Sequence, residues 1–267
     1  MADNVEMSDY IPIDDYDSFE ERHAYFVEMM AEMLAQFAAV RPRDGRGDLA
    51  RGQVLELGAG TGHFTRRITA QPEVDCVAVE IDDVCFAKLS ANLGARPNVT
   101  LRREDSVAFR PEGATRQFHG VFSSFSDHHI RPADRGRYFE NVKRCLAPGG
   151  AFIVGDEFLP DHDPADEAAW RDALTSYHSH IIDVSRDSAE RLTKEGRPGE
   201  AHAHHKLIQL ETEALQSGLG RIGDFKVSRR EYEESLTAHG LAFGSTKIGP
   251  LGRDDLGGVY VYVISAN

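Results

Sequence analysis

Runs of consecutive apolar residues alternate along the chain with stretches in which apolar residues recur at helical spacing. Each short run predicts a β-strand buried on both faces, because a half-exposed strand would alternate apolar with polar residues. Five such strands are expected at 53–57, 75–81, 99–102, 120–125 and 151–155. Helices between successive strands indicate a mostly parallel sheet covered on both faces, which is the doubly wound α/β architecture.

After the fifth strand the pattern becomes mainly helical. Helices are expected over 163–193, 201–216 and 228–239, and two further strands over 241–248 and 259–264. The short, glycine-containing connection at 249–258 indicates a hairpin, so the last strand should be antiparallel. The sheet would then have seven strands, with a helical insert at about 160–226 between strands 5 and 6.

The N-terminal residues 1–50 are interpreted as a flap followed by a helix. Residues 1–17 are polar and acidic with interspersed Tyr and Ile, which suits a segment that folds over a site. Ser18, with Glu21 three residues later, is a capping-box pattern and predicts a helix that continues to Val40. Residues 51–267 are expected to form one larger domain.

Composition and charge narrow the classes of partner. The 267 residues are 41% apolar and 28% charged, with a formal net charge of −14. Such a negative surface argues against nucleic acid or an anionic membrane as the main partner. The three cysteines are too few and too scattered for a disulfide framework. Because no signal peptide or membrane-length apolar run is present, we expect a cytoplasmic protein.

A glycine-rich turn follows the first strand. It reads Glu56-Leu-Gly-Ala-Gly-Thr-Gly62 and runs into a helix near His63. Glycines allow a sharp turn and leave main-chain N–H groups open to a ligand. Three further features stand at the ends of later elements: Glu80 closes the second strand, Asp105-Ser106 follows the third, and Pro148-Gly149-Gly150 precedes the fifth. A carboxylate such as Glu80 suits the two hydroxyls of a ribose.

These features together resemble the class I S-adenosylmethionine-dependent methyltransferases, over residues 50–157 and the last two strands. The resemblance implies that S-adenosyl-L-methionine is the cofactor. An NAD-dependent enzyme is the competing interpretation, but Glu56 stands closer to the turn than a pyrophosphate would favour. The residues expected to bind the cofactor are Glu56, Gly58, Ala59, Gly60, Gly62, Glu80, Ile81, Asp105, Ser106 and Ser123.

Candidate catalytic residues follow the fourth and fifth strands, at the edge of the sheet where ligands of such folds bind. They are Asp127, His128, His129 and Glu157. Histidines are also dense in the insert, where His202 and His205 can share a helix face. Asp127, His128 and His205 are therefore a candidate metal-binding set, and a divalent metal (Fe, Zn or Ni) is a second cofactor hypothesis.

We expect a methyltransferase that acts on a small metabolite. The sharpest hypothesis is metal-assisted C-methylation of the β-carbon of a 2-oxo acid, in which the metal would stabilise an enolate. The alternative is a metal-free O- or N-methyltransferase of a small natural product. Hypotheses from another class are an S-adenosylmethionine lyase or cyclase, or a cofactor-binding regulator. The expected partner is a small-molecule substrate, and the sequence allows a homodimer.

Overall fold

The computed structural model describes residues 7–9, 13, 16, 20–43, 50–111 and 117–266. These residues form a seven-stranded sheet with the strand order β3-β2-β1-β4-β5-β7-β6. The first five strands run parallel, and β7 lies antiparallel between β5 and β6. The predicted α/β fold with an antiparallel last strand is confirmed. The strands are β1 (Gly52–Leu57), β2 (Val74–Glu80), β3 (Val99–Arg103), β4 (Phe118–Ser124), β5 (Leu146–Phe158), β6 (Leu241–Gly249) and β7 (Gly258–Ala266).

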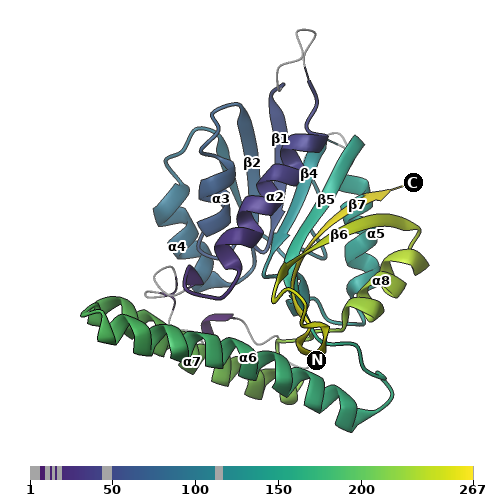
Figure 1. Cartoon of the computed structure of the whole chain (residues 1–267). Helices are drawn as coiled ribbons and strands as arrows, with labels where there is room; N and C mark the ends of the chain where they lie inside the picture. The colour runs from purple at the N-terminus through teal and green to yellow at the C-terminus, as the bar shows by residue number, and fades with distance from the viewer. Residues whose placement is uncertain are drawn as a thin grey trace.

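Helices cover both faces of this sheet (Figure 1). Successive side chains of a strand point to opposite faces, so β1 contributes Val54 to one core and Leu55 to the other. On the Val54 side lie α2 (Phe26–Val40), α3 (His63–Ile68) and α4 (Asp83–Leu93). On the Leu55 side lie α5 (Arg135–Cys145) and α8 (Arg229–Ala238), the latter begun by a capping box at Ser228.

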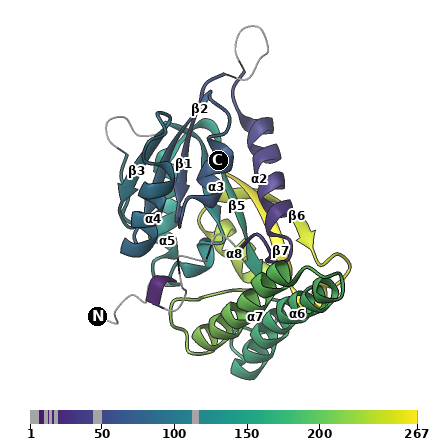
Figure 2. The same ribbon diagram turned by 90° about the vertical axis from the view of Figure 1, so that its left-hand side faces the viewer.

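Two long helices, α6 (Glu167–Lys194) and α7 (Pro198–Leu219), form the insert between β5 and β6. They lie side by side beneath the edge at which the parallel strands end (Figure 1; Figure 2). The Asp166 carboxylate caps α6 by accepting from the N–H groups of Ala168 and Ala169. Within the described ranges, no helix is both long and apolar enough to cross a lipid bilayer.

The N-terminal helix is shorter than the sequence pattern predicts. It begins at Phe26, whereas the expected cap, Ser18, lies outside the described residues. Tyr25 has a φ of 71°, a left-handed conformation that a right-handed helix cannot include. Residues 21–25 therefore form a turn, which brings the buried residue His23 within 3.3 Å of Glu211 of α7.

Most of the expected flap also lies outside the described residues. Of the part that is described, η1 (Met7–Asp9) places the Ser8 N–H 2.7 Å from the Asp82 carboxylate. Further along, Ile13 packs in a small cluster with Cys85 of α4 and Leu210 of α7. These contacts connect the N-terminal segment with the main sheet domain and with the insert.

The Pro148-Gly149-Gly150 sequence lies inside β5 and does not form a turn before it. Phe118 of β4 pairs with Leu146 of β5, but Gly120 pairs with Ala151, so β5 carries extra residues at this point. Such a bulge lets a strand lengthen without losing its alignment further along. The strand therefore continues from Leu146 to Phe158 and presents its end at the edge of the sheet.

Candidate functional site

A cavity of about 1110 Å³ opens where the parallel strands end. This is the position at which doubly wound sheets bind their ligands, because the loops that follow adjacent strands diverge there. Its walls come mainly from loops after β1, β2, β3 and β4, with further residues from α2, α3 and the segment before α8. The loop residues are 58–61, 80–82, 105–107, 124–126 and 129–134.

The glycine turn forms the floor of the cavity. Gly58 has a φ of 72°, and a Cβ atom there would lie 1.8 Å from the Ser126 hydroxyl oxygen. Glycine is therefore required both by the backbone conformation and by the close approach of the β4 loop. Gly62 has a different role, because a Cβ atom there would lie 2.6 Å from Leu89 and Leu93 of α4. It allows close packing and does not line the cavity.

Glu80 lies at the end of β2 and faces the glycine turn. Its Oε2 accepts a hydrogen bond from the Gly60 N–H at 2.7 Å, and its Oε1 accepts from the N–H groups of Ile81 and Asp82. Burial raises the pKa of Glu80, although these three hydrogen bonds favour the charged form. The two carboxylate oxygens have about four lone-pair sites and these hydrogen bonds use three of them, so Oε2 can still accept from one hydroxyl of a ribose.

The adenine end of a nucleoside would lie against Ile81, Asp105 and Ser106. Asp105 is fixed by accepting from the Val107 N–H through Oδ1, which leaves Oδ2 for an exocyclic amine. Ile81 is 39% exposed and lines the cavity, so it offers an apolar surface to a flat ring. The donors, acceptors and apolar surface present here therefore fit S-adenosylmethionine.

Glu56 and Ser123 differ in their relation to this cavity. Glu56 lines it, but its carboxyl is buried and bonded to the Thr65 hydroxyl, and burial raises its pKa to about 8. It is therefore neutral at pH 7 unless a cation, such as a sulfonium, lies nearby. Ser123 is fully buried and is not part of the cavity lining, whereas Ser124 and Ser126 are.

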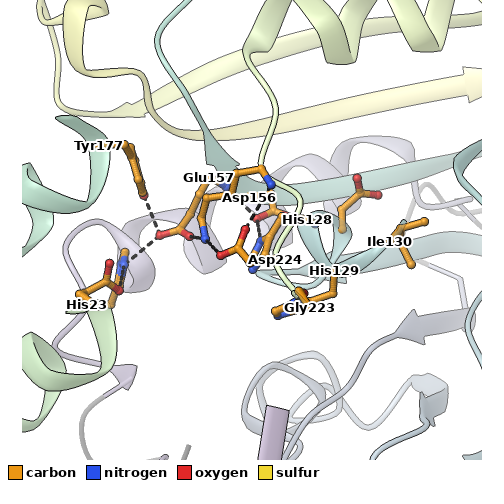
Figure 3. A network of polar contacts seen from close by, with 12 residues as sticks. His23, His128, His129, Ile130, Asp156, Glu157, Tyr177, Gly223 and Asp224 are labelled. Carbon is orange, nitrogen blue, oxygen red and sulfur yellow. Dashed lines mark hydrogen bonds and ion pairs between the residues drawn. The ribbon is translucent and has the colours of Figure 1, made fainter. Parts of the chain in front are cut away.

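Of the four candidate catalytic residues, His129 is the one that lines the cavity. Its Nδ1 lies 2.6 Å from the Gly223 carbonyl oxygen and donates to it, so Nε2 is an acceptor. Burial, followed by the nearby His128, lowers the pKa of His129 to about 4. The ring is therefore neutral at physiological pH, and Figure 3 shows it beside Gly223.

Asp127 and His128 do not line the cavity; each is buried and bonded to another side chain. Asp127 is paired with Arg135, which also donates to its main-chain carbonyl. The Nδ1 atom of the His128 ring lies 2.6 Å from Asp156 Oδ1. The main-chain N–H of His128 donates to the other oxygen of the same carboxylate. Burial opposes the charged ring, but the Asp156 charge raises the pKa of His128.

Glu157, the fourth candidate, belongs to a separate buried cluster that Figure 3 shows in part. Its Oε1 lies 2.9 Å from His23 Nε2 and accepts from the Tyr177 hydroxyl at 2.6 Å. Its Oε2 lies 3.1 Å from the Lys226 ammonium. Glu211 of α7 approaches the same His23 nitrogen at 3.3 Å. Burial lowers the pKa of His23, but both carboxylates outweigh it and raise the pKa to about 10.

The expected metal set of Asp127, His128 and His205 is not brought together. His205 is exposed on α7, while the other two are buried against Arg135 and Asp156. Among the described residues, the group close enough to share one ion is His23, Glu157 and Glu211. Their wide separation in sequence leaves no spacing motif, so sequence reasoning identified Glu157 alone.

A family model described as "Methyltransferase domain" matches residues 54–150. Among curated proteins, the polyamine aminopropyltransferase of Salmonella arizonae is 28% identical over 178 residues. That match covers 56% of this chain and 62% of the relative, so the chain spans less than two thirds of the relative's length. The aminopropyltransferase of Salmonella paratyphi B matches to the same extent.

Solved structures with the same fold include three that cover most of both chains. The DhpI–SAM–HEP complex has a TM-score of 0.54 at 18% identity, and the match covers 94% of this chain and 92% of the DhpI chain. The 1,6-didemethyltoxoflavin-N1-methyltransferase of Burkholderia thailandensis has a TM-score of 0.53 at 15% identity, covering 100% and 93%. A Haloferax volcanii putative methyltransferase, in complex with the activator Trm112, has a TM-score of 0.56 at 14% identity, covering 96% and 98%. At these identities the likeness establishes the fold.

Proposed function

We propose that this chain, whose residues 54–150 match a methyltransferase-domain model, is an S-adenosylmethionine-dependent methyltransferase that methylates an aromatic oxygen or nitrogen atom of a small molecule. The observation that carries the proposal is the neutral His129 ring in the wall of the cavity. When bound, the cofactor supplies a sulfonium methyl group, whose C–S bond breaks as the new C–O or C–N bond forms. The chain's own residues must hold the acceptor and receive its proton.

His129 can accept a hydrogen bond from the acceptor through Nε2, because Nδ1 is committed to Gly223. A base whose conjugate acid has a pKa of about 4 is too weak to remove a proton from an aliphatic alcohol. It is suited to orienting a phenol, an enol or a ring N–H, whose proton becomes strongly acidic as the bond to the methyl group forms and then passes to Nε2. Such orientation supplies a large part of the rate in bimolecular group transfer.

The apolar character of the cavity supports a flat acceptor. Its aromatic and aliphatic lining consists of Phe26, Phe64, Phe125, Ile130, Ile222 and Phe225. At about 1110 Å³ the cavity lies at the upper end of the usual range for ligand pockets, so it can hold a cofactor together with a small second molecule. Glu80 and Asp105 would hold the nucleoside, and His129 would face the acceptor.

Metal-assisted C-methylation of a 2-oxo acid ranks second. A metal that stabilises an enolate must contact the substrate. His23, Glu157 and Glu211 are absent from the residues that line the cavity, and the Phe125 ring, which does line it, packs against His23. O- or N-methylation needs no such contact, which is why we place it first.

A panel of phenols, N-heterocycles, amines and 2-oxo acids, incubated with methyl-labelled S-adenosylmethionine, tests the proposal. We expect label in a phenol or heterocycle, with one S-adenosylhomocysteine formed for each product. Label in 2-oxo acids alone would support C-methylation. Formation of methylthioadenosine without any acceptor would indicate a lyase, and cofactor binding without turnover would indicate a regulator.

Replacing His129 by alanine should lower kcat by ~10²-fold, the lower end of what a positioned acid–base group contributes. Cofactor affinity should stay within error, because His129 is not among the residues that face the nucleoside. Steady-state kinetics with the acceptor found above, together with calorimetric titration of S-adenosylhomocysteine, check both expectations. His202→Ala, at an exposed position of α7, is the matched control. Equal activity in the two variants would remove His129 from the mechanism.

The pH profile of the wild-type enzyme should lack an inflection from His129 near 6.5, the usual pKa of histidine. Burial lowers the pKa of His129 to about 4, so the neutral, accepting form persists until the pH falls through about 4. Measurement of kcat between pH 5 and 9 checks this. A loss of rate centred near 6.5 that is absent from His129→Ala would contradict the shifted pKa.

A further inference from the structure

Three acceptor atoms converge in the interior between the sheet and the insert. His23 Nε2 lies 2.9 Å from Glu157 Oε1 and 3.3 Å from Glu211 Oε1. All three ligand atoms lie within 4.8 Å of one another, and all three residues are buried. Metal–ligand bonds of ~2.1 Å separate adjacent ligands by ~3.0 Å in octahedral and ~3.4 Å in tetrahedral sites. The two separations from His23 Nε2 match those of adjacent ligands in such a coordination shell.

The His23 ring is oriented as a metal-binding histidine is. Its Nδ1 lies 2.9 Å from the Ala24 carbonyl oxygen, which makes Nδ1 the donor and leaves the Nε2 lone pair directed at the two carboxylates. Metal-ligating histidines commonly donate their second ring N–H to a main-chain carbonyl, which fixes the tautomer. Because an unprotonated Nε2 and two carboxylate oxygens repel one another, either a proton on Nε2 or a metal ion must lie between them.

The local charge also favours a divalent ion over a single proton. Glu157, Glu211 and Asp224 are buried, and Lys226 contacts two of these three carboxylates. Among the described side chains in direct contact with the three carboxylates, Lys226 is the one lysine or arginine. With His23 and His178 both neutral, a divalent ion balances the remaining two negative charges, whereas a proton on His23 alone balances one. Buried charge without a counterion is costly, so this balance bears on stability.

The outer oxygens of both carboxylates are themselves held. Glu211 Oε2 lies 2.8 Å from His178 Nδ1, and Glu157 Oε2 lies 3.1 Å from the Lys226 ammonium. The Tyr177 hydroxyl donates to Glu157 Oε1, the oxygen that faces His23. Outer contacts of this kind fix the direction of ligand atoms and are a regular feature of metal sites. They also explain why the ligands can stay close together despite coming from three separate segments.

We propose that His23, Glu157 and Glu211 bind a divalent transition-metal ion, with Mn²⁺ or Fe²⁺ favoured by the two carboxylate ligands. The ion joins the N-terminal turn, the end of β5 and α7. It therefore fastens the insert and the N-terminal segment over the edge of the sheet where the cavity opens. The site stands apart from the acceptor, so the inference does not depend on which molecule is methylated.

Metal binding is tested on the full-length protein after dialysis against a chelator. Mn²⁺, Fe²⁺, Zn²⁺ and Co²⁺ are added separately, and binding is followed by calorimetry, by melting temperature and, for Co²⁺, by its visible absorption. We expect one ion per chain, a higher melting temperature and a Co²⁺ spectrum typical of nitrogen and oxygen ligands. Failure of the wild-type protein to bind any of the four ions would overturn the proposal.

Glu211→Gln preserves the shape of the ligand and removes its charge, so it should weaken Mn²⁺ binding by ~100-fold or more. Glu213→Gln, the same substitution two residues further along α7, is the matched control and should bind as the wild type does. Unchanged Mn²⁺ affinity in Glu211→Gln would also overturn the proposal. If Glu211→Gln does not fold, the Co²⁺ spectrum of the wild-type protein still tests whether the bound ion has nitrogen and oxygen ligands.

Discussion

Replacing Glu80 by alanine is expected to weaken cofactor binding by ~10–10²-fold. The Glu80 carboxylate is held by the N–H groups of Gly60, Ile81 and Asp82, and we propose that its remaining lone pair, on Oε2, accepts from a ribose hydroxyl. A hydrogen bond to a charged group contributes ~1.5–3 kcal/mol, so losing one accounts for this range. Calorimetric titration of S-adenosylhomocysteine measures the effect directly.

The matched control is Glu104→Ala, which removes an exposed carboxylate just after β3. Its cofactor affinity should equal that of the wild type. Glu80→Ala must also be shown to fold, because Glu80 supports the glycine turn as well; circular dichroism and melting temperature serve for this. A folded Glu80→Ala protein with unchanged affinity would show that the ribose lies elsewhere.

Arg135→Met should lower the free energy of unfolding by about 3 kcal/mol, the lower end of the range for breaking a buried ion pair. Arg135 is buried, is paired with Asp127 and donates to the carbonyl oxygens of Asp127 and Ile130. Methionine fills much of the volume but leaves the Asp127 carboxylate without its cation. Protonation of Asp127, whose pKa burial already raises, limits the loss.

Urea unfolding at pH 7 provides the measurement, and Arg137→Met on the same helix provides the control. Arg137 is 69% exposed and pairs with Asp134 three residues away, so its loss should change stability by less than about 0.5 kcal/mol. Equal stability of the two variants would show that the Asp127–Arg135 ion pair does not hold the loop after β4 in place. Another contact would then have to fix the position of His129.

These pairings change the interpretation of the chemistry-bearing residues after β4. Asp127 and His128 look like a catalytic pair in the sequence, but each is neutralised by a buried partner, Arg135 and Asp156. They form the support on which the neighbouring His129 is held. The residue left facing the cavity is thus selected by the side chains that pack behind it.

Prediction from sequence succeeds where the signal is local. The strands and the glycine turn depend on residues that are adjacent along the chain, and Glu80 follows directly from the end of its strand. The start of α2 was predicted too early, because the capping-box pattern at Ser18 does not reveal that Tyr25 adopts a left-handed conformation. Likewise, the sequence Pro148-Gly149-Gly150 is typical of a turn, but in the structure it forms a bulge within β5.

By itself, the sequence determined the α/β class, the position of the glycine turn and the edge of the sheet at which the cavity opens. Burial patterns and turn residues act over a few positions, so a single chain carries that information directly. Only the tertiary structure decided that His129 faces the cavity and that His23 meets Glu157 and Glu211. Those outcomes depend on which side chains meet across distant segments and on the charges that burial brings together, and no local pattern encodes them.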